Sequence, residues 1–151
     1  MHDEPLRWGL YDCRAPLTHD QADFPFTAIS DERCLRRQLE RFQQMDAGIL
    51  YLVSPTDDAL RIGLGGKVGV LQCRLPSSEF NGQYAQSGTM EAGEFVEFAS
   101  EGLDEPFWSP NLLPPEEVIA AAVHFYKTQQ LAPGMCWGAR YWGEYKVAES
   151  D

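Results

Sequence analysis

Two segments of the chain repeat apolar residues with the period of an α-helix. The first places apolar side chains at spacings of four, three and three, on Leu35, Leu39, Phe42 and Met45. Residues at these spacings lie on one face of a helix. Ser30 stands just before them as an N-cap, and two acidic residues follow it in the first turn, where the helix dipole favours carboxylates. The pattern predicts an amphipathic helix over residues 31–45.

The second helical segment begins at a pair of prolines. The sequence PPEE at residues 114–117 is typical of a helix start, because proline is tolerated in the first turn and carboxylates are favoured there. Apolar residues then recur at helical spacing as far as Tyr126. We expect the helix to run from residue 115 to about residue 130, because the sequence APG at residues 132–134 breaks it.

Short apolar or alternating runs predict the strands of one sheet. Residues 49–53 form a continuous apolar run. Residues 60–64 and 68–75 flank Gly65-Gly66, a pair that suits a tight hairpin turn with positive φ angles. Further strand segments are expected at residues 83–86, 94–99 and 135–142.

The order of these elements indicates the fold class. Short connections between successive strands favour antiparallel pairing over crossovers. We therefore predict an α+β protein with a mainly antiparallel sheet and two principal helices packed against it. The 151 residues predict a single domain, with a core over residues 26–142 and an N-terminal extension of unassigned role over residues 1–25.

Three features predict a cytoplasmic protein without a membrane span. The longest apolar run, residues 118–123, has six residues, against the roughly 20 that a spanning helix needs. The first five residues are acidic, where a signal peptide would be basic. The four cysteines lie far apart with no C-x-x-C pair, which favours free thiols in a reducing compartment.

Charge is distributed unevenly along the chain. The net charge is −11, which disfavours direct binding to nucleic acid or to anionic lipid. Between Leu75 and Tyr126 there is no Lys or Arg, while nine carboxylates lie in that stretch. By contrast, the arginines of the first predicted helix are interpreted as ordinary helix surface, since Glu32 and Arg36 are spaced as an i,i+4 ion pair.

The acidic stretch is the candidate partner-binding surface, although charge runs are often only solvated faces. Trp108 lies beside it in a segment that we interpret as a proline-flanked loop, and exposed aromatic residues are common interface anchors. The residues predicted to bind a partner are Glu91, Glu94, Glu97, Glu101, Asp104, Glu105 and Trp108.

The sequence contains no recognisable catalytic or metal-binding motif. The three histidines are scattered, and neither H-E-x-x-H nor G-x-S-x-G is present. The glycine-rich residues 63–69 lack the P-loop order and have no helix after them. Cys136 is interpreted as a small buried hydrophobic residue beside a buried Trp137. We predict no catalytic residue, no cofactor site and no metal site, and hence no enzyme.

Several segments together resemble a known family. They are LRIGLGGKVG at residues 60–69, NGQYAQSG at 81–88, LLPPEEVIAAAVHFYKTQQLAP at 112–133 and a final strand with Trp137. This order resembles the first-numbered family of bacterial immunity proteins, over about residues 30–142. Members of that family are small cytoplasmic inhibitors encoded beside polymorphic toxins, often nucleic-acid deaminases. The resemblance implies an α+β inhibitor that binds a cognate toxin domain, blocks its active site and has no chemistry of its own.

The resemblance and the charge pattern lead to one hypothesis and two alternatives. Toxins that act on nucleic acid commonly present a basic groove, which an acidic inhibitor complements. We therefore expect an immunity protein whose partner is a cognate toxin domain with a basic active-site cleft. The alternatives are a non-catalytic interaction or adaptor module and, on the number of carboxylates alone, a small carboxylate-dependent enzyme.

Overall fold

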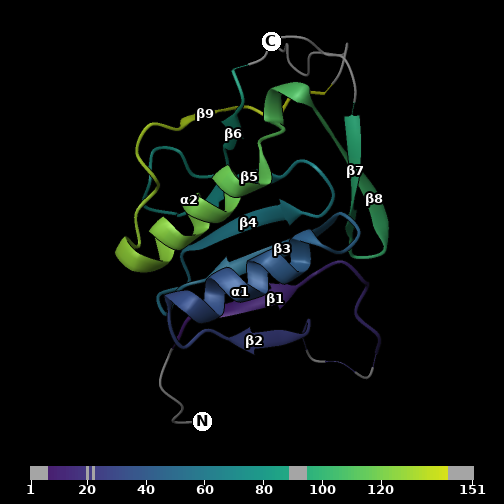
Figure 1. Ribbon diagram of the computed structural model, residues 1–151, viewed down its shortest axis with the longest axis vertical. Coiled ribbons are helices and arrows are strands. Elements are labelled where there is room, and N and C mark those ends of the chain that lie inside the picture. Colours follow the sequence, from purple (N-terminus) through teal and green to yellow (C-terminus); the bar gives the residue numbers. More distant parts are fainter. Residues whose placement is uncertain (1–6, 20, 22, 89–94, 143–151) are drawn as a thin grey trace.

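The computed structural model describes residues 7–19, 21, 23–88 and 95–142. Within these ranges the chain forms helices α1 (Glu32–Gln43) and α2 (Pro115–Thr128) and a short 3-10 helix, η1 (Ser109–Asn111). The strands are β1 (Gly9–Asp12), β2 (Phe26–Ala28), β3 (Gly48–Val53), β4 (Ala59–Leu64), β5 (Val70–Arg74), β6 (Tyr84–Gln86), β7 (Phe95–Ser100), β8 (Leu103–Trp108) and β9 (Cys136–Gly138). The predicted α+β class, with helices packed on an antiparallel sheet, is confirmed (Figure 1).

Seven strands form the body of the sheet in the order β2-β1-β3-β4-β5-β6-β9, and all neighbours in this order are antiparallel. The predicted hairpin around Gly65-Gly66 is β4–β5, and both glycines have positive φ. Its connection is longer than the tight turn expected, because it runs over residues 65–69 and β5 begins at Val70 instead of residue 68. Strands β7 and β8 form a separate hairpin. It joins the body of the sheet at a single parallel bridge between Gly48 of β3 and Ala99 of β7.

The segment before residue 26, whose role the sequence left open, contributes a strand to the sheet. Strand β1 lies between β2 and β3 and pairs antiparallel with both. Its Leu10 is buried in the main core. Residues 9–12 are therefore part of the folded unit, and their pairing with β3 joins segments about 40 residues apart in sequence.

Helix α1 has the predicted apolar stripe, but its two ends differ from the prediction. It ends at Gln43, so Met45 lies beyond the helix. The N-cap is Asp31, whose Oδ1 accepts a hydrogen bond of 2.7 Å from the backbone N–H of Cys34; Ser30, the predicted cap, precedes it. Both residues are good caps, and the aspartate also adds negative charge at the helix N-terminus. The expected ion pair between Glu32 and Arg36 is present at 3.9 Å.

Helix α2 begins as predicted, with Pro115 in the first turn and two glutamates after it. It ends at Thr128, two residues short of the expected end. The next residue, Gln129, adopts a left-handed conformation (φ 56°) and donates its backbone N–H to the carbonyl of Phe125. This geometry caps the helix before the APG sequence is reached.

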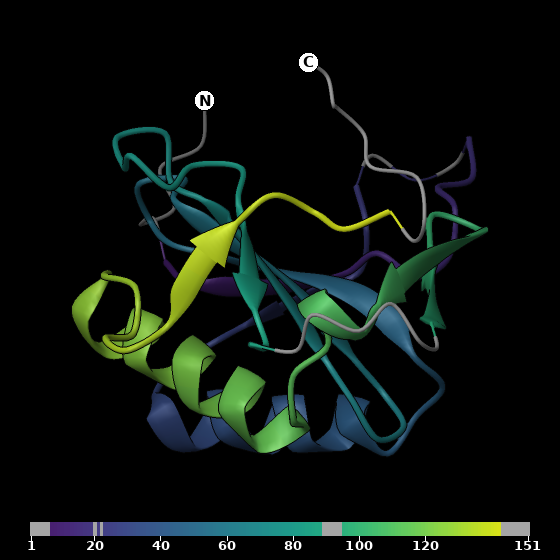
Figure 2. The same ribbon diagram turned by 90° about the horizontal axis from the view of Figure 1, so that it is seen from above.

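The sheet has a separate core on each of its faces. Both helices lie on one face (Figure 2), where Leu35, Leu39, Val118 and Phe125 are buried against the sheet. On the opposite face a smaller core lies between the sheet and the β7–β8 hairpin, formed by Ile49, Val70, Tyr84, Phe98 and Phe107. The hairpin is thus positioned by its own apolar contacts, away from the helices.

The C-terminal strand differs from its prediction. It has three residues, Cys136–Gly138, instead of the eight expected over residues 135–142. Cys136 is exposed and Trp137 is half-buried, so the prediction that both are buried is wrong. Strand β9 lies at the edge of the sheet, where only β6 covers it, and an edge position leaves one side open to solvent. All four cysteines carry free thiols, as predicted.

Candidate functional site

The candidate site lies on the β7–β8 hairpin, which contains the described residues that were predicted to bind a partner. Its strands pair from Phe95↔Trp108 to Ser100↔Leu103. The turn consists of Glu101 and Gly102, whose φ angles of 54° and 88° are both positive. Positive φ at both central residues is the requirement of a tight two-residue hairpin turn that matches the twist of its strands.

Strand β8 was not predicted from the sequence, and the interpretation of Trp108 as a loop residue is wrong. Trp108 is the last residue of β8 and pairs with Phe95 of β7. Pro106 and two carboxylates made this segment unlike a strand, since all three are depleted in sheets. Proline is tolerated here because β8 is an edge strand that pairs only with β7.

The alternation of side chains sorts the hairpin into two faces. The side that faces the sheet contains the buried Phe98 and Phe107, and Glu105 shares their side because it lies two residues before Phe107. The opposite side faces away from the sheet. We define the outer hairpin face as the charged and aromatic residues on this outward side, which also contains Ala99 and Pro106, together with the exposed turn residue: Phe95, Glu97, Glu101, Asp104 and Trp108.

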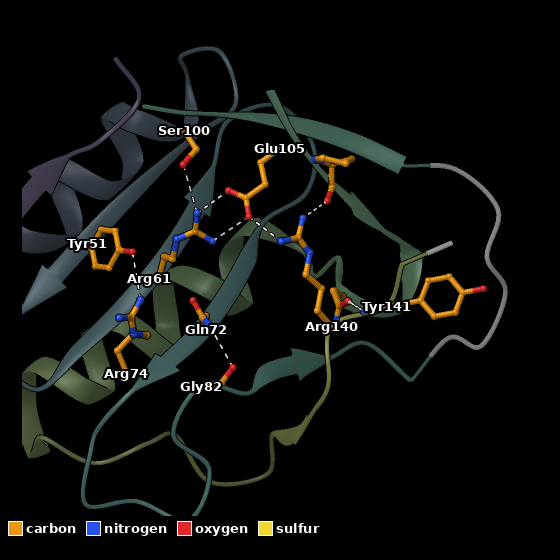
Figure 3. Close-up of polar contacts among 11 residues, drawn as sticks. Tyr51, Arg61, Gln72, Arg74, Gly82, Ser100, Glu105, Arg140 and Tyr141 are labelled. Atoms are coloured by element: carbon orange, nitrogen blue, oxygen red, sulfur yellow. Dashed lines mark hydrogen bonds and ion pairs between the residues drawn. The ribbon is translucent and has the colours of Figure 1, made fainter. Parts of the chain in front are cut away.

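Glu105 lies in an internal ion-pair cluster (Figure 3). Its Oε1 is 2.5 Å from Nη2 of Arg61 on β4, and its Oε2 is 2.7 Å from Nη1 of Arg140. The side chains of Arg61 and Arg140 are only 12% and 10% exposed. Burial by itself would raise the pKa of Glu105, but the hydrogen bonds and positive charges of the two arginines outweigh it and lower that pKa.

Arg140, in the segment that follows β9, connects this segment to the hairpin. Its guanidinium carbon lies 3.9 Å from the ring centre of Phe107 and 4.0 Å from that of Trp142. It also donates a hydrogen bond to the backbone carbonyl of Pro106 on β8. A guanidinium held between two aromatic rings is favourable and sterically specific. These contacts fix the orientation of the hairpin on the sheet.

The carboxylates of the outer hairpin face have no such partners. Glu97, Glu101 and Asp104 are exposed, and none forms an ion pair within the part of the chain that the structure describes. Beside them Phe95, which is 50% exposed, contacts the ring of Trp108 with centroids 5.3 Å apart. The surface therefore combines uncompensated negative charge with an accessible aromatic pair.

Backbone hydrogen bonds hold the turn of the hairpin in place. The N–H of Glu101 donates to the carbonyl of Cys13 at 2.8 Å, and that of Gly102 donates to the carbonyl of Arg14 at 3.1 Å. On β7, next to the turn, the N–H of Ala99 donates to the carbonyl of Ala47 at 3.0 Å. The outer hairpin face is therefore a supported surface, anchored at both its turn and its sheet-facing side.

The structure brings four of the seven predicted partner-binding residues together on the outer hairpin face: Glu97, Glu101, Asp104 and Trp108. Glu105 is turned inward and neutralised by the two arginines, so it is not part of this face. Glu91 and Glu94 lie outside the described residues. The exposed Phe95 was missed, although its place two residues before Glu97 signals a shared face.

The described residues contain neither a cluster of metal-ligating side chains nor a membrane-spanning helix. Among them, no group of three or more His, Cys, Asp or Glu side chains is placed to hold a metal ion. No helix in the described ranges is long and apolar enough to cross a membrane.

Comparison with known proteins adds no assignment. No protein-family model, no curated protein and no solved structure matches this chain. The resemblance to the first-numbered family of immunity proteins therefore stays a prediction that rests on the sequence segments. The geometry of the hairpin is the independent observation on which a functional proposal can be built.

Proposed function

We propose that this protein is an immunity protein that binds a cognate bacterial toxin domain and occludes its active site. The toxin is expected to act on nucleic acid, as deaminase toxins do, and to present a basic cleft. The outer hairpin face is the proposed contact surface. In this proposal the protein contributes binding alone, and the toxin supplies the chemistry that is blocked.

The observation that carries the proposal is the contrast between the two sides of one hairpin. The inward carboxylate of Glu105 forms ion pairs with two arginines, whereas the outward carboxylates of Glu97, Glu101 and Asp104 form none with the described residues. Unpaired carboxylates on a supported surface attract a positively charged partner, mainly by raising the association rate and by fixing its orientation. The same charges repel nucleic acid, so the surface suits a protein that competes with nucleic acid for a basic cleft.

The aromatic pair supplies what charge alone does not. Large aromatic side chains near the centre of an interface often provide most of its binding free energy, while charged residues at the rim provide selectivity. Phe95 and Trp108 lie at the open end of the hairpin, and the carboxylates continue from them to the turn. This arrangement fits an apolar anchor flanked by electrostatic steering.

The test begins with the protein as bait in the source cell, at low and high salt. The proposal expects one retained polypeptide with a toxin-like C-terminal domain, and growth of cells that express this domain only when the bait is co-expressed. Capture without rescue of growth would contradict inhibition. A captured domain that binds equally well at both salt concentrations would contradict the electrostatic part of the proposal.

A pair of charge-reversed variants then tests the surface. Glu97→Lys with Asp104→Lys changes the net charge from −11 to −7 (two reversals of +2 each) on the outer hairpin face. The matched control, Glu40→Lys with Glu79→Lys, makes the same change at exposed positions outside the hairpin. We expect the first variant to lose toxin binding and protection while the control keeps both. Equal losses would show that only overall charge matters, and would refute this surface.

A further inference from the structure

A cavity of about 300 Å³ adjoins the turn of the hairpin. Apolar walls from Pro16, Phe24 and Ala99 contribute to its lining. Its volume is at the lower end of the range for small-molecule sites. A space of this size can hold one inserted side chain. We call it the tip cavity.

The tip cavity is continuous with the outer hairpin face. Ala99 belongs to β7 and lines the cavity, and it pairs with Asp104 of the outer hairpin face. The backbone bonds from Glu101 and Gly102 to residues 13 and 14 hold the turn against the same wall. The tip cavity therefore adjoins the outer hairpin face, within reach of a partner that contacts that face.

The charges that line the tip cavity leave a negative excess. Arg14 donates from Nε and Nη2 to the carboxylate of Asp12 at 2.8 and 2.7 Å, and this contact lowers the pKa of Asp12. Its third nitrogen is directed to the sulfur of Met45 at 3.6 Å. Arg14 and Asp12 thus neutralise each other. Asp46, also in the lining, is exposed and forms no ion pair among the residues described.

We propose that the tip cavity binds a long basic side chain, an arginine or a lysine, of the partner protein. The apolar walls accept its methylene groups, and Asp46 at the lining accepts its charged end. An acidic side chain is disfavoured, because Arg14 is already paired with Asp12 and the remaining charge of the lining is negative. This inference rests on the proposed function, since it names the element of the partner that the protein recognises.

The experiment uses the whole protein and two small probes of the same shape, one with a cationic end group and one with a neutral end group. Amide spectra of ¹⁵N-labelled protein are recorded during titration with N-acetyl-arginine methylamide and, separately, with its neutral isostere N-acetyl-citrulline methylamide. We expect the arginine probe to shift the amides of Ala47 and Ala99 in a saturable way, and the citrulline probe to shift them far less. Equal shifts with both probes, or shifts spread over the whole surface, would overturn the proposal.

Two variants test whether the cavity itself binds the probe. Asp46→Asn should weaken the arginine probe by about two- to fivefold, the range that an exposed ion pair provides. Glu79→Gln, an exposed carboxylate outside both the lining and the hairpin, should leave the probe affinity unchanged. Unchanged affinity in Asp46→Asn would refute the role of Asp46 and with it the proposal.

The two proposals fail in distinguishable ways. If the arginine probe does not bind, but charge reversal on the outer hairpin face abolishes toxin binding, only the cavity proposal is refuted. If the probe binds and Asp46→Asn weakens it, but no toxin is inhibited, only the proposed function is refuted.

Discussion

The ion-pair cluster around Glu105 allows a quantitative prediction. Replacing Glu105 with glutamine removes the single carboxylate that faces both Arg61 and Arg140, and it leaves two nearly buried cations without a counter-charge. Removal of one partner from a buried ion pair typically costs about 3 to 5 kcal/mol. Because Glu105 is itself 21% exposed, we expect a loss near the lower limit, about 3 kcal/mol, in the free energy of unfolding.

Equilibrium unfolding in urea, followed by circular dichroism and tryptophan fluorescence, measures this loss. For a chain of this length, a loss of about 3 kcal/mol corresponds to a fall of about 6 to 12 °C in the melting temperature. Asp104→Asn is the matched control, because the carboxylate of Asp104, next to Glu105 in the sequence, is exposed and has no ion pair in the described structure. We expect its unfolding midpoint to be unchanged.

A double variant tests whether the two arginines compete for one carboxylate. Arg140→Met in the Glu105→Gln background removes one of the two unpaired cations, so the double variant should lose less stability than the sum of the single variants. Losses that add would contradict the shared cluster. A loss below about 1 kcal/mol for Glu105→Gln, the value typical of an exposed pair, would refute the argument that burial makes this cluster important.

Three further predictions concern pH, thiols and the glycine turn. The folded-state pKa of Glu105 lies below its ordinary value of 4.5. The stabilisation that ionised Glu105 provides is therefore complete above pH 4.5 and is lost as the pH falls through the folded-state pKa. The stability difference between wild type and Glu105→Gln should shrink on acidification, as urea unfolding at each pH would show. Cys136 is exposed and should react with iodoacetamide in the native protein. Cys13 is buried, and burial raises its pKa to about 12, so it should react only after unfolding. Mass spectrometry can follow both reactions. Gly65→Ala should destabilise more than Gly66→Ala in urea unfolding, because a Cβ at Gly65 would lie 2.4 Å from neighbouring backbone while that at Gly66 meets nothing within 4 Å.

The sequence predicted those elements that patterns of neighbouring residues determine. The two helices and the glycine hairpin follow from periodicity, prolines and turn residues, and their bounds agree with the structure to within about two residues. The helix cap was misplaced by one residue because Ser30 and Asp31 are both good caps. The sequence did not place β1, since its pairing with β3 depends on contacts between distant segments.

The sequence predicted which residues of the candidate site are acidic, but not which way their side chains face. The acidic character of residues 97–105 is visible in the sequence. The sequence did not predict strand β8, which turns the side chains of Asp104 and Glu105 to opposite sides. Once β8 is known, alternation places Glu105 with Phe107 and Asp104 on the opposite side. The arginines that neutralise Glu105 come from β4 and from the segment after β9, and no local pattern joins residues so far apart.

The two-sided hairpin also separates two evolutionary constraints. Substitutions on its inward side disturb the small core and the ion-pair cluster, so selection for folding acts on them strongly. Substitutions of exposed residues on its outward side have little effect on folding. Under the proposed function, the outward side of these two short strands can therefore accept new side chains while the other side keeps the hairpin in register. The same division makes the outward positions a natural target for a randomised library.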